Sequence, residues 1–118
     1  MDLVVFKRAV EESWGKDTCY PKCSDQWSQN NPALGQCAVT ALLVQDYFGG
    51  DILYCSHNDH FFNYVEGLGE VDLTKNQFSE ETTICRDEIK TRDEVMSVNA
   101  MTPERYRLLK QRVEKSLL

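Results

Sequence analysis

The sequence lacks any apolar run long enough to span a bilayer, and its start has no basic segment followed by an apolar one. These two absences predict a protein without a secretion signal or a membrane span, so the cytoplasm is its expected location. Basic residues are also scarce, with 13 against 19 acidic residues and a net charge of −6. Phosphate backbones and anionic lipids repel such a chain, so we expect neither nucleic acid nor a membrane as partner.

An even set of cysteines is missing too. The chain has five, and no secretion signal accompanies them, so a disulfide framework is not expected. Cys19 and Cys23 have a spacing that zinc ligands use, but a structural zinc site needs four ligands, and two free loop thiols are the simpler interpretation. We therefore predict no metal and no cofactor. Repeats, low-complexity tracts and linkers are absent as well, so residues 1–118 are predicted to form a single domain.

Three stretches have the pattern of helices. Residues 2–14 carry apolar side chains at three- and four-residue steps, and residues 36–48 are apolar nearly all round, which predicts a buried central helix. Thr102 and Pro103 predict the start of a final helix, as N-cap and first residue. The buried stripe of this last helix is predicted to consist of Tyr106, Leu109, Val113 and Leu117.

Strands are predicted between the helices, at residues 51–55, 60–66 and 70–74, with a hairpin turn at 67–69. Residues 15–35 form a long polar loop, a feature that is often functional in a small domain. A short helix is predicted near 86–93. The order helix, helix, strands, helix predicts an α+β fold in which the central helix packs on a small antiparallel sheet.

Cys37 is the residue best placed for chemistry. It stands at the start of the predicted central helix, where unpaired backbone N–H groups stabilise a thiolate and can receive an oxyanion. The sequence offers only two bases, His57 in a polar turn and His60 at the start of an apolar strand, and the strand position is better fixed. Asp72 interrupts an apolar strand and is the candidate that orients the imidazole.

The hairpin between the last two predicted strands tests this triad. Side chains alternate between the faces of a strand, so His60 and Asp72 must share the same parity. A three-residue loop at 66–68 would pair Phe62 with Asp72 and put His60 diagonally within reach of it. A two-residue loop would pair Asn63 with Asp72 and send His60 to the other face.

Three motifs in this order resemble the core of papain- and transglutaminase-like enzymes. Gly35-Gln36-Cys37-Ala38 is similar to the transglutaminase Gly-Gln-Cys-Trp motif, with Ala38 in place of Trp. His60-Phe61-Phe62-Asn63 is similar to His-x-Trp-Asn, with Phe62 in place of Trp. Asp72-Leu73-Thr74-Lys75-Asn76-Gln77 is similar to Asp-x-Thr-Pro-Gln, with one extra residue before Gln77. The resemblance implies a papain/transglutaminase-like fold with Cys37, His60 and Asp72 as its triad.

Three more side chains are candidates for binding substrate or the oxyanion. Gln36 can donate from its amide, and the Trp27 indole N–H can serve as it does in transglutaminases. The alternative for Trp27 is an anchor that packs its loop on the core, and this alternative is favoured. Asn63 either holds strand edges together or contacts substrate.

Most of the chain resembles the small bacterial YunG-like proteins. The resemblance rests on Asn31-Pro32-Ala33-Leu34-Gly35-Gln36-Cys37-Ala38-Val39-Thr40-Ala41-Leu42, on Gln45-Asp46-Tyr47-Phe48-Gly49-Gly50, on Asp72-Leu73-Thr74 and on Gln77-Phe78. It implies an architecture but names no substrate.

These patterns favour a cysteine hydrolase or acyltransferase that acts on an amide or ester bond. A protein or peptide that bears such a bond is a candidate substrate. Cys37 would attack the carbonyl, His60 would move the proton, and Asp72 would hold the imidazole. Two alternatives stay open: a non-catalytic binding domain that keeps the fold, and a thiol redox sensor that uses Cys37 or the Cys19/Cys23 pair.

Overall fold

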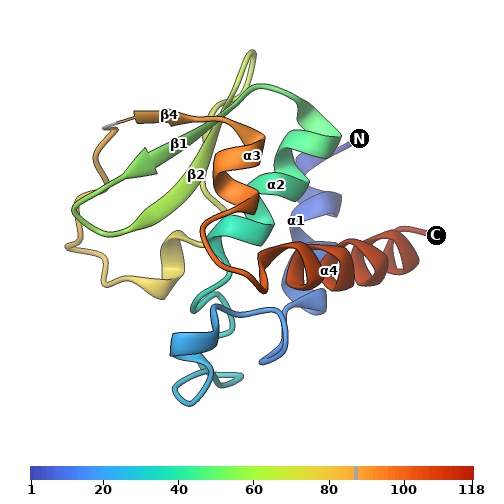
Figure 1. Ribbon diagram of the computed structural model, residues 1–118. Coiled ribbons are helices and arrows are strands. Elements are labelled where there is room, and N and C mark those ends of the chain that lie inside the picture. The colour runs from blue at the N-terminus through green and yellow to red at the C-terminus, as the bar shows by residue number, and fades with distance from the viewer. Residues whose placement is uncertain (87) are drawn as a thin grey trace.

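The computed structural model describes residues 1–86 and 88–118. Figure 1 shows an antiparallel sheet on the left and the α-helices on the right, so the predicted α+β class is confirmed. The α-helices are α1 (Leu3–Ser13), α2 (Cys37–Phe48), α3 (Arg92–Met96) and α4 (Thr102–Ser116), and the short 3-10 helices are η1 (Pro21–Cys23) and η2 (Lys75–Gln77). The strands are β1 (Asp51–Cys55), β2 (His60–Val65), β3 (Gly69–Val71) and β4 (Glu88–Lys90).

The sheet has the strand order β3-β2-β1-β4, and each neighbouring pair is antiparallel. In the β2–β3 hairpin, Val65 pairs with Gly69 and Asn63 with Val71, so the connecting loop has three residues, 66–68. Gly67 and Gly69 have positive φ angles that few other residues adopt. This is the register that brings His60 and Asp72 to the same face, as predicted.

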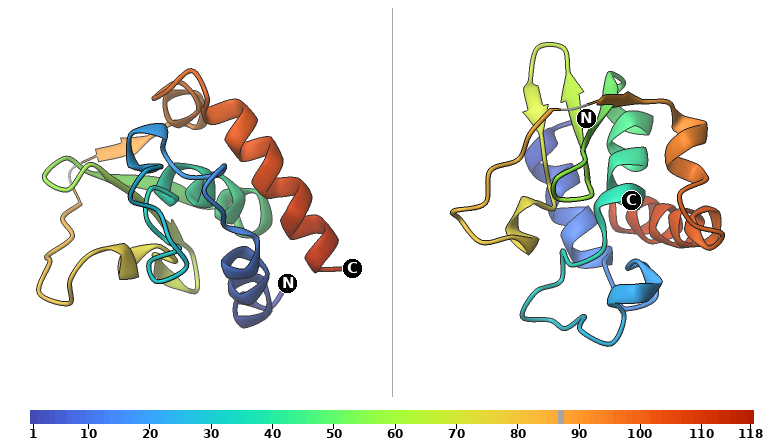
Figure 2. Two further views of the ribbon diagram at one scale, coloured as in Figure 1. Left: turned by 90° about the horizontal axis from the view of Figure 1, so that it is seen from below. Right: turned by 60° about the vertical axis from the view of Figure 1, so that its left-hand side comes forward.

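Helix α2 is the buried centre of the molecule, as its all-round apolar sequence predicts. It packs on β2 and β1 with one side and on α4 with another, while α1 packs on α4 (Figure 2). Its residues from Ala38 to Val44 are all buried. Leu109 and Val113 of α4 are completely buried against this core, which confirms the predicted stripe. The core fixes α2, so the residues at its N-terminus have well-defined positions.

The ends of the helices differ from prediction by small steps. Asp2 caps α1 by accepting a hydrogen bond from the Val4 N–H at 2.7 Å. Helix α4 takes Met101 as its N-cap, so Thr102 is its first residue instead of its cap. The Thr102 hydroxyl accepts a hydrogen bond from Arg105 within the first turn, at 3.4 Å. Helix ends commonly differ by one residue in this way.

The region near 86–93 corrects the prediction of a short helix there. The chain instead adds β4 to the free edge of β1, and α3 begins at Arg92 behind a capping box formed by Thr91 and Glu94. Residue 87 of the predicted helix lies outside the described residues. A three-residue edge strand carries little periodicity of its own, so pairing with β1 decides its structure.

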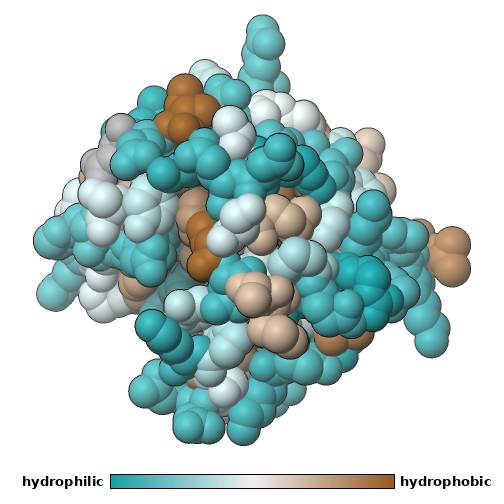
Figure 3. All heavy atoms as spheres, in the orientation of Figure 1, coloured by the Kyte–Doolittle hydropathy of each residue, from teal (hydrophilic) through white to brown (hydrophobic). Residues whose placement is uncertain are grey.

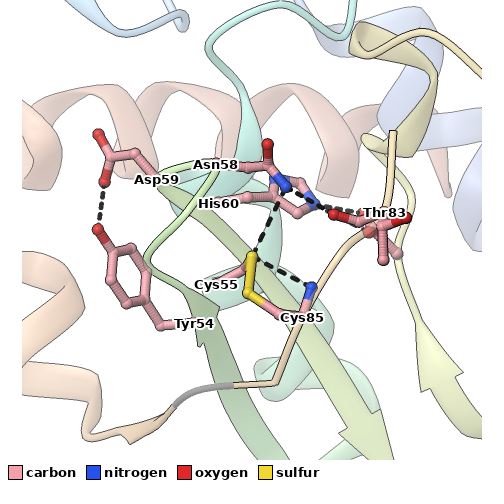
Figure 4. The surroundings of a disulfide bond; sticks show 8 residues. Tyr54, Cys55, Asn58, Asp59, His60, Thr83 and Cys85 are labelled. Atoms are coloured by element: carbon pink, nitrogen blue, oxygen red, sulfur yellow. Dashed lines mark hydrogen bonds and ion pairs between the residues drawn. A yellow bond between two sulfur atoms is a disulfide. The ribbon is translucent and has the colours of Figure 1, made fainter. Parts of the chain in front are cut away.

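A disulfide joins Cys55 to Cys85, which corrects the expectation drawn from the odd number of cysteines. Cys55 ends β1 and Cys85 lies on the segment that returns to pair with β1, so the two Cα atoms come to 5.0 Å. Figure 4 shows this bond beside the β1–β2 turn, where Asn58 donates to the Thr83 carbonyl at 2.9 Å. Across the described residues, no helix has the length and apolar character needed to cross a membrane.

Candidate functional site

Cys37 is the first residue of α2 and lines a cavity of about 360 Å³. The backbone just before it is held by Gly35, which has a φ of +72° and accepts a hydrogen bond from the Tyr20 N–H at 2.8 Å. A Cβ atom at Gly35 would lie 2.8 Å from the Tyr20 nitrogen, so a larger residue would force the loop away. Glycine therefore fixes the approach to the thiol, and the Cys37 N–H lies in the first helical turn, where no helical acceptor exists.

His60 and Asp72 form a close pair, as the hairpin register predicts. The His60 Nε2 atom lies 2.8 Å from Asp72 Oδ2 and 3.0 Å from Oδ1. The imidazole is completely buried, whereas the Asp72 side chain is 13% exposed. Phe62 stacks beside the ring and Phe78 contacts it edge-on, with centroid distances of 5.8 and 4.9 Å. These contacts fix both the position and the plane of the imidazole.

The pKa of His60 is raised to about 9. Burial acts against this by disfavouring the charged ring, but the Asp72 carboxylate and the Cys37 side chain both favour it and together outweigh burial. At neutral pH the ring is therefore an imidazolium, paired with the Asp72 carboxylate and further favoured by Cys37. Because Nε2 is engaged with Asp72, Nδ1 is the atom left for Cys37.

The three predicted catalytic residues thus come together, Asp72 and Cys37 both acting on His60. The His60 Nδ1 atom is buried and has no hydrogen-bond partner among the described residues. A short hydrogen bond between the thiol and Nδ1 is thus not formed in this structure. Catalytic hydrogen bonds are often long before substrate binds, so this geometry is compatible with a nucleophile–base pair.

Gln77 is a site residue that the sequence analysis did not select. It ends η2 and lines the same cavity as Cys37. Its Oε1 accepts a hydrogen bond from the Gly35 N–H at 3.2 Å, which leaves the Nε2 amide as a donor. Within the described part of the chain, that Nε2 is buried without a hydrogen-bond partner. The signal was present in the sequence, because Gln77 closes the motif that resembles Asp-x-Thr-Pro-Gln.

Arg105 is the second residue that the sequence analysis missed. It comes from α4, lines the cavity and is only 4% exposed. Its Nη1 donates to the carbonyls of Thr18 and Gly35 at 3.1 and 3.4 Å, while its Nε has no partner. Burial lowers the pKa of the guanidinium, whereas Cys37 is among the groups that raise it. No sequence motif predicts that Arg105 lines the cavity, because its position depends on how α4 packs.

Gln36, Trp27 and Asn63, the predicted oxyanion or substrate contacts, do not line the cavity in the described structure. Gln36 is completely buried; its Oε1 accepts from the Thr18 hydroxyl at 2.8 Å and its Nε2 donates to the Gly15 carbonyl at 3.0 Å. The Trp27 indole donates to the Pro32 carbonyl at 3.0 Å, which makes it the loop anchor that the alternative described. The Gln36 donor is therefore used inside the protein instead of facing the cavity, and the hydrogen bond of Trp27 fits the anchor interpretation that was favoured for it.

Asn63 uses its donor in the same way. It lies in β2 and its Nδ2 donates to the Ala41 carbonyl of α2 at 3.0 Å. It is 2% exposed and so ties the sheet to the central helix. In all three side chains the donor group makes a hydrogen bond inside the protein.

The remaining free thiols lie in the loop before α2. Cys23 lines the cavity, whereas Cys19 is buried and its Sγ donates to the Lys16 carbonyl at 3.0 Å. Burial raises the pKa of Cys19, so this thiol stays protonated at neutral pH. Among the described residues no cluster of three or more histidine, cysteine or acidic side chains is arranged to hold a metal ion. The face in Figure 3 is largely hydrophilic with a few separate hydrophobic groups, so it presents no broad apolar surface.

Comparison with known proteins identifies the family of the chain. A family model described as "YunG protein" matches residues 2–118. A curated protein of Bacillus subtilis (strain 168), "Uncharacterized protein YunG", is 36% identical over 74 residues, which cover 61% of this chain and 59% of that protein. The chain therefore spans about three fifths of the length of this curated relative. No solved structure matches the chain. The family match extends over nearly all residues, and the chain belongs to the YunG protein family.

Proposed function

We propose that the chain is a cysteine hydrolase or acyltransferase that acts on an amide or ester, with a core of the papain/transglutaminase type. The observation that carries the proposal is the buried His60 imidazole, which lies 2.8 Å from Asp72 and whose charge is favoured by Cys37, a residue of the cavity lining. Each of the three residues also has a structural interpretation when taken alone. A buried imidazolium beside a half-buried thiol that faces a cavity has a specific chemical use, because it favours the reactive thiolate.

The first half of the reaction forms a thioester. The Cys37 proton resides on His60, so the thiolate attacks the carbonyl carbon and the carbonyl electrons move to oxygen. The Cys37 N–H and the Gln77 Nε2 are the proposed donors to this oxyanion. When the tetrahedral intermediate collapses, the bond to the leaving group breaks and the His60 imidazolium protonates the departing amine or alcohol.

The second half releases the acyl group. Neutral His60 removes a proton from water or from an acceptor amine, which attacks the thioester carbon. Collapse of this second intermediate returns the electrons to Cys37 as thiolate and leaves His60 protonated. Asp72 holds the ring in one orientation and stabilises its charge throughout. Water gives hydrolysis and an amine gives transfer, with the same residues.

We propose that the enzyme works in the cytoplasm, where a free Cys37 stays reduced, although the Cys55–Cys85 disulfide is a bond that oxidising compartments favour. Its proposed partner is a compound or peptide that brings an amide or ester into the cavity. We propose neither nucleic acid nor a membrane as partner, because the net charge of −6 opposes both.

An activated ester, p-nitrophenyl acetate, tests the proposal directly. We expect a burst of p-nitrophenolate and an acetyl group on Cys37, located by peptide mass spectrometry. Cys37→Ala should abolish both, whereas Cys23→Ala, which removes the other cavity thiol, should keep them. If acetyl groups form elsewhere in the native chain while Cys37 stays unmodified, the proposal is wrong and a non-catalytic binding domain becomes the better account.

A further inference from the structure

Arg105 carries a buried positive charge that no carboxylate neutralises within the described part of the chain. Its three hydrogen bonds go to neutral oxygens, the carbonyls of Thr18 and Gly35 and the hydroxyl of Thr102. The Tyr20 ring lies below the guanidinium, 5.9 Å from its carbon to the ring centroid. Ion pairs join other arginines of the described chain to acids, but none involves Arg105. A buried charge without a counter-ion is costly, and arginine is seldom buried unpaired.

The hydrogen bonds of Arg105 explain only part of its presence. They tie α4 to the loop before α2, which is a structural role that a neutral amide could share. They do not use Nε, which is buried and has no hydrogen-bond partner in residues 1–86 and 88–118. A guanidinium offers five N–H donors in a planar fork suited to a carboxylate. The side chain therefore retains both charge and donors for a further partner.

The cavity is where such a partner would lie. Arg105 and Cys37 line the same space, which has a volume of about 360 Å³ and suits a small ligand or the end of a chain. Among the described residues, Asp59 is the one other charged side chain of the lining, and it accepts a hydrogen bond from the Tyr54 hydroxyl at 2.6 Å. Asp59 repels an anion, so a negative group would bind toward Arg105. The cavity thus has a positive and a negative side, and the thiol opens into it.

We propose that Arg105 binds a carboxylate of the substrate, so that the cavity selects a small acyl compound with a carboxylate near the carbonyl that Cys37 attacks. This inference rests on the proposed function, because it names the substrate class of the same site. It also gives Arg105 a role in binding substrate, in addition to the hydrogen bonds by which it ties α4 to the loop before α2. The carboxylate would complete the ion pair that the free protein leaves open.

Two alkylating agents of similar size but different charge test this inference. Iodoacetamide is neutral and iodoacetate is negative, so the ratio of their rates at Cys37 reports the local charge and not the amount of thiolate. We expect the iodoacetate-to-iodoacetamide ratio at Cys37 to exceed that of N-acetylcysteine by about tenfold, as one partly screened ion pair would give. Arg105→Gln should lower this ratio severalfold, while the His60 imidazolium keeps it above that of the free thiol.

The matched control is Arg107→Gln, which removes an exposed arginine from the same helix and should leave the ratio unchanged. Fast iodoacetamide labelling with the same ratio in the native chain and in Arg105→Gln would overturn the inference and leave the proposed function intact. Slow labelling of Cys37 by iodoacetamide would instead count against the proposed function.

A second measurement needs neither the thiol nor a variant. The Nε–Hε NMR signal of Arg105 in the native chain should shift saturably with N-acetylglycine and stay in place with N-acetylglycinamide, which lacks the charge. Equal shifts with both compounds, or no saturable shift with either, would overturn the inference even if Arg105→Gln fails to fold.

Discussion

Two sets of polar side chains with buried donor atoms lie around the N-terminal half of α2, and they differ in how fully they are hydrogen-bonded. The paired set consists of Gln36, Thr40 and Asn63, each of which has found partners inside the protein. The Cys37 set consists of His60, Gln77 and Arg105, each of which leaves one buried nitrogen without a partner. These three nitrogens are all the unpaired buried side-chain N and O atoms among the described residues.

This difference distinguishes side chains that stabilise the fold from side chains available to bind substrate, near the N-terminus of α2. An unpaired buried polar atom costs about 1–3 kcal/mol, so a protein retains few of them. The paired set joins the loop, α1 and β2 to α2 and so builds the frame. The Cys37 set gathers its unpaired atoms around one thiol and one cavity. In the proposed site, Cys37 is the partner of the His60 Nδ1, and a substrate is the partner of the Gln77 and Arg105 nitrogens.

The largest effect expected in the Cys37 set is on the pH dependence of stability. The pKa of His60 is about 9 in the folded chain and near 6.5 when unfolded, so folding favours the protonated ring. This stabilisation is fully present below pH 6.5 and is lost as the pH rises through 9. Its size is about 3 kcal/mol. Urea unfolding from pH 6 to 10 should show this loss in the native chain and not in His60→Gln.

Asp72→Asn is the control for the cause of that shift. It removes the carboxylate that raises the pKa of His60 and should remove most of the pH-dependent difference between the native chain and His60→Gln. An unchanged difference in Asp72→Asn would mean that the pair at 2.8 Å does not govern the imidazole.

A smaller effect compares one glutamine from each set. Gln36→Ala removes partners from the Thr18 hydroxyl and the Gly15 carbonyl, so the free energy of unfolding should fall by about 2 kcal/mol. Gln77→Ala loses one longer hydrogen bond from the Gly35 N–H and should cost less than about 1 kcal/mol. Urea unfolding of both variants measures the contrast.

The two variants should have the opposite order in reactivity: Gln77→Ala should lose more acylation rate than Gln36→Ala. If Gln77 donates to the oxyanion, Gln77→Ala should slow acylation by p-nitrophenyl acetate by about a hundredfold. Gln36→Ala should keep the acylation rate while it remains folded. Equal acylation rates in the native chain and Gln77→Ala would remove Gln77 from the site and weaken the contrast between the two sets.

The sequence predicted the helices and the pair of His60 and Asp72 better than it predicted which side chains line the cavity. The period of the apolar residues located α1, α2 and α4, and the turn glycines with strand parity located the pair of His60 and Asp72. These are local patterns, and each depends on residues close together in the chain. Gln36 was expected to donate to substrate, but a donor near the thiol in sequence can be turned inward by folding, and the structural alternatives weighed for Trp27 and Asn63 fit their hydrogen bonds.

Other features depend on distant packing and had no local signal. Arg105 stands in a mixed run of charges that resembles a solvated helix face, yet α4 directs it against the loop before Cys37. Cys55 and Cys85 are 30 residues apart and meet only because β4 returns to the edge of β1. Tertiary contacts decide both, and a single sequence does not contain them as a pattern.

The central claim is that His60 makes Cys37 a reactive thiolate, and the rate of Cys37 alkylation by iodoacetamide against pH tests it most directly. We predict fast labelling at pH 6.5, where a free thiol with a pKa of about 8.5 is about 1% ionised, and a roughly hundredfold loss in His60→Ala. His57→Ala, which removes the other histidine, should keep the native rate. Slow labelling of Cys37 at pH 6.5, at the same rate in the native chain and in His60→Ala, would contradict the account.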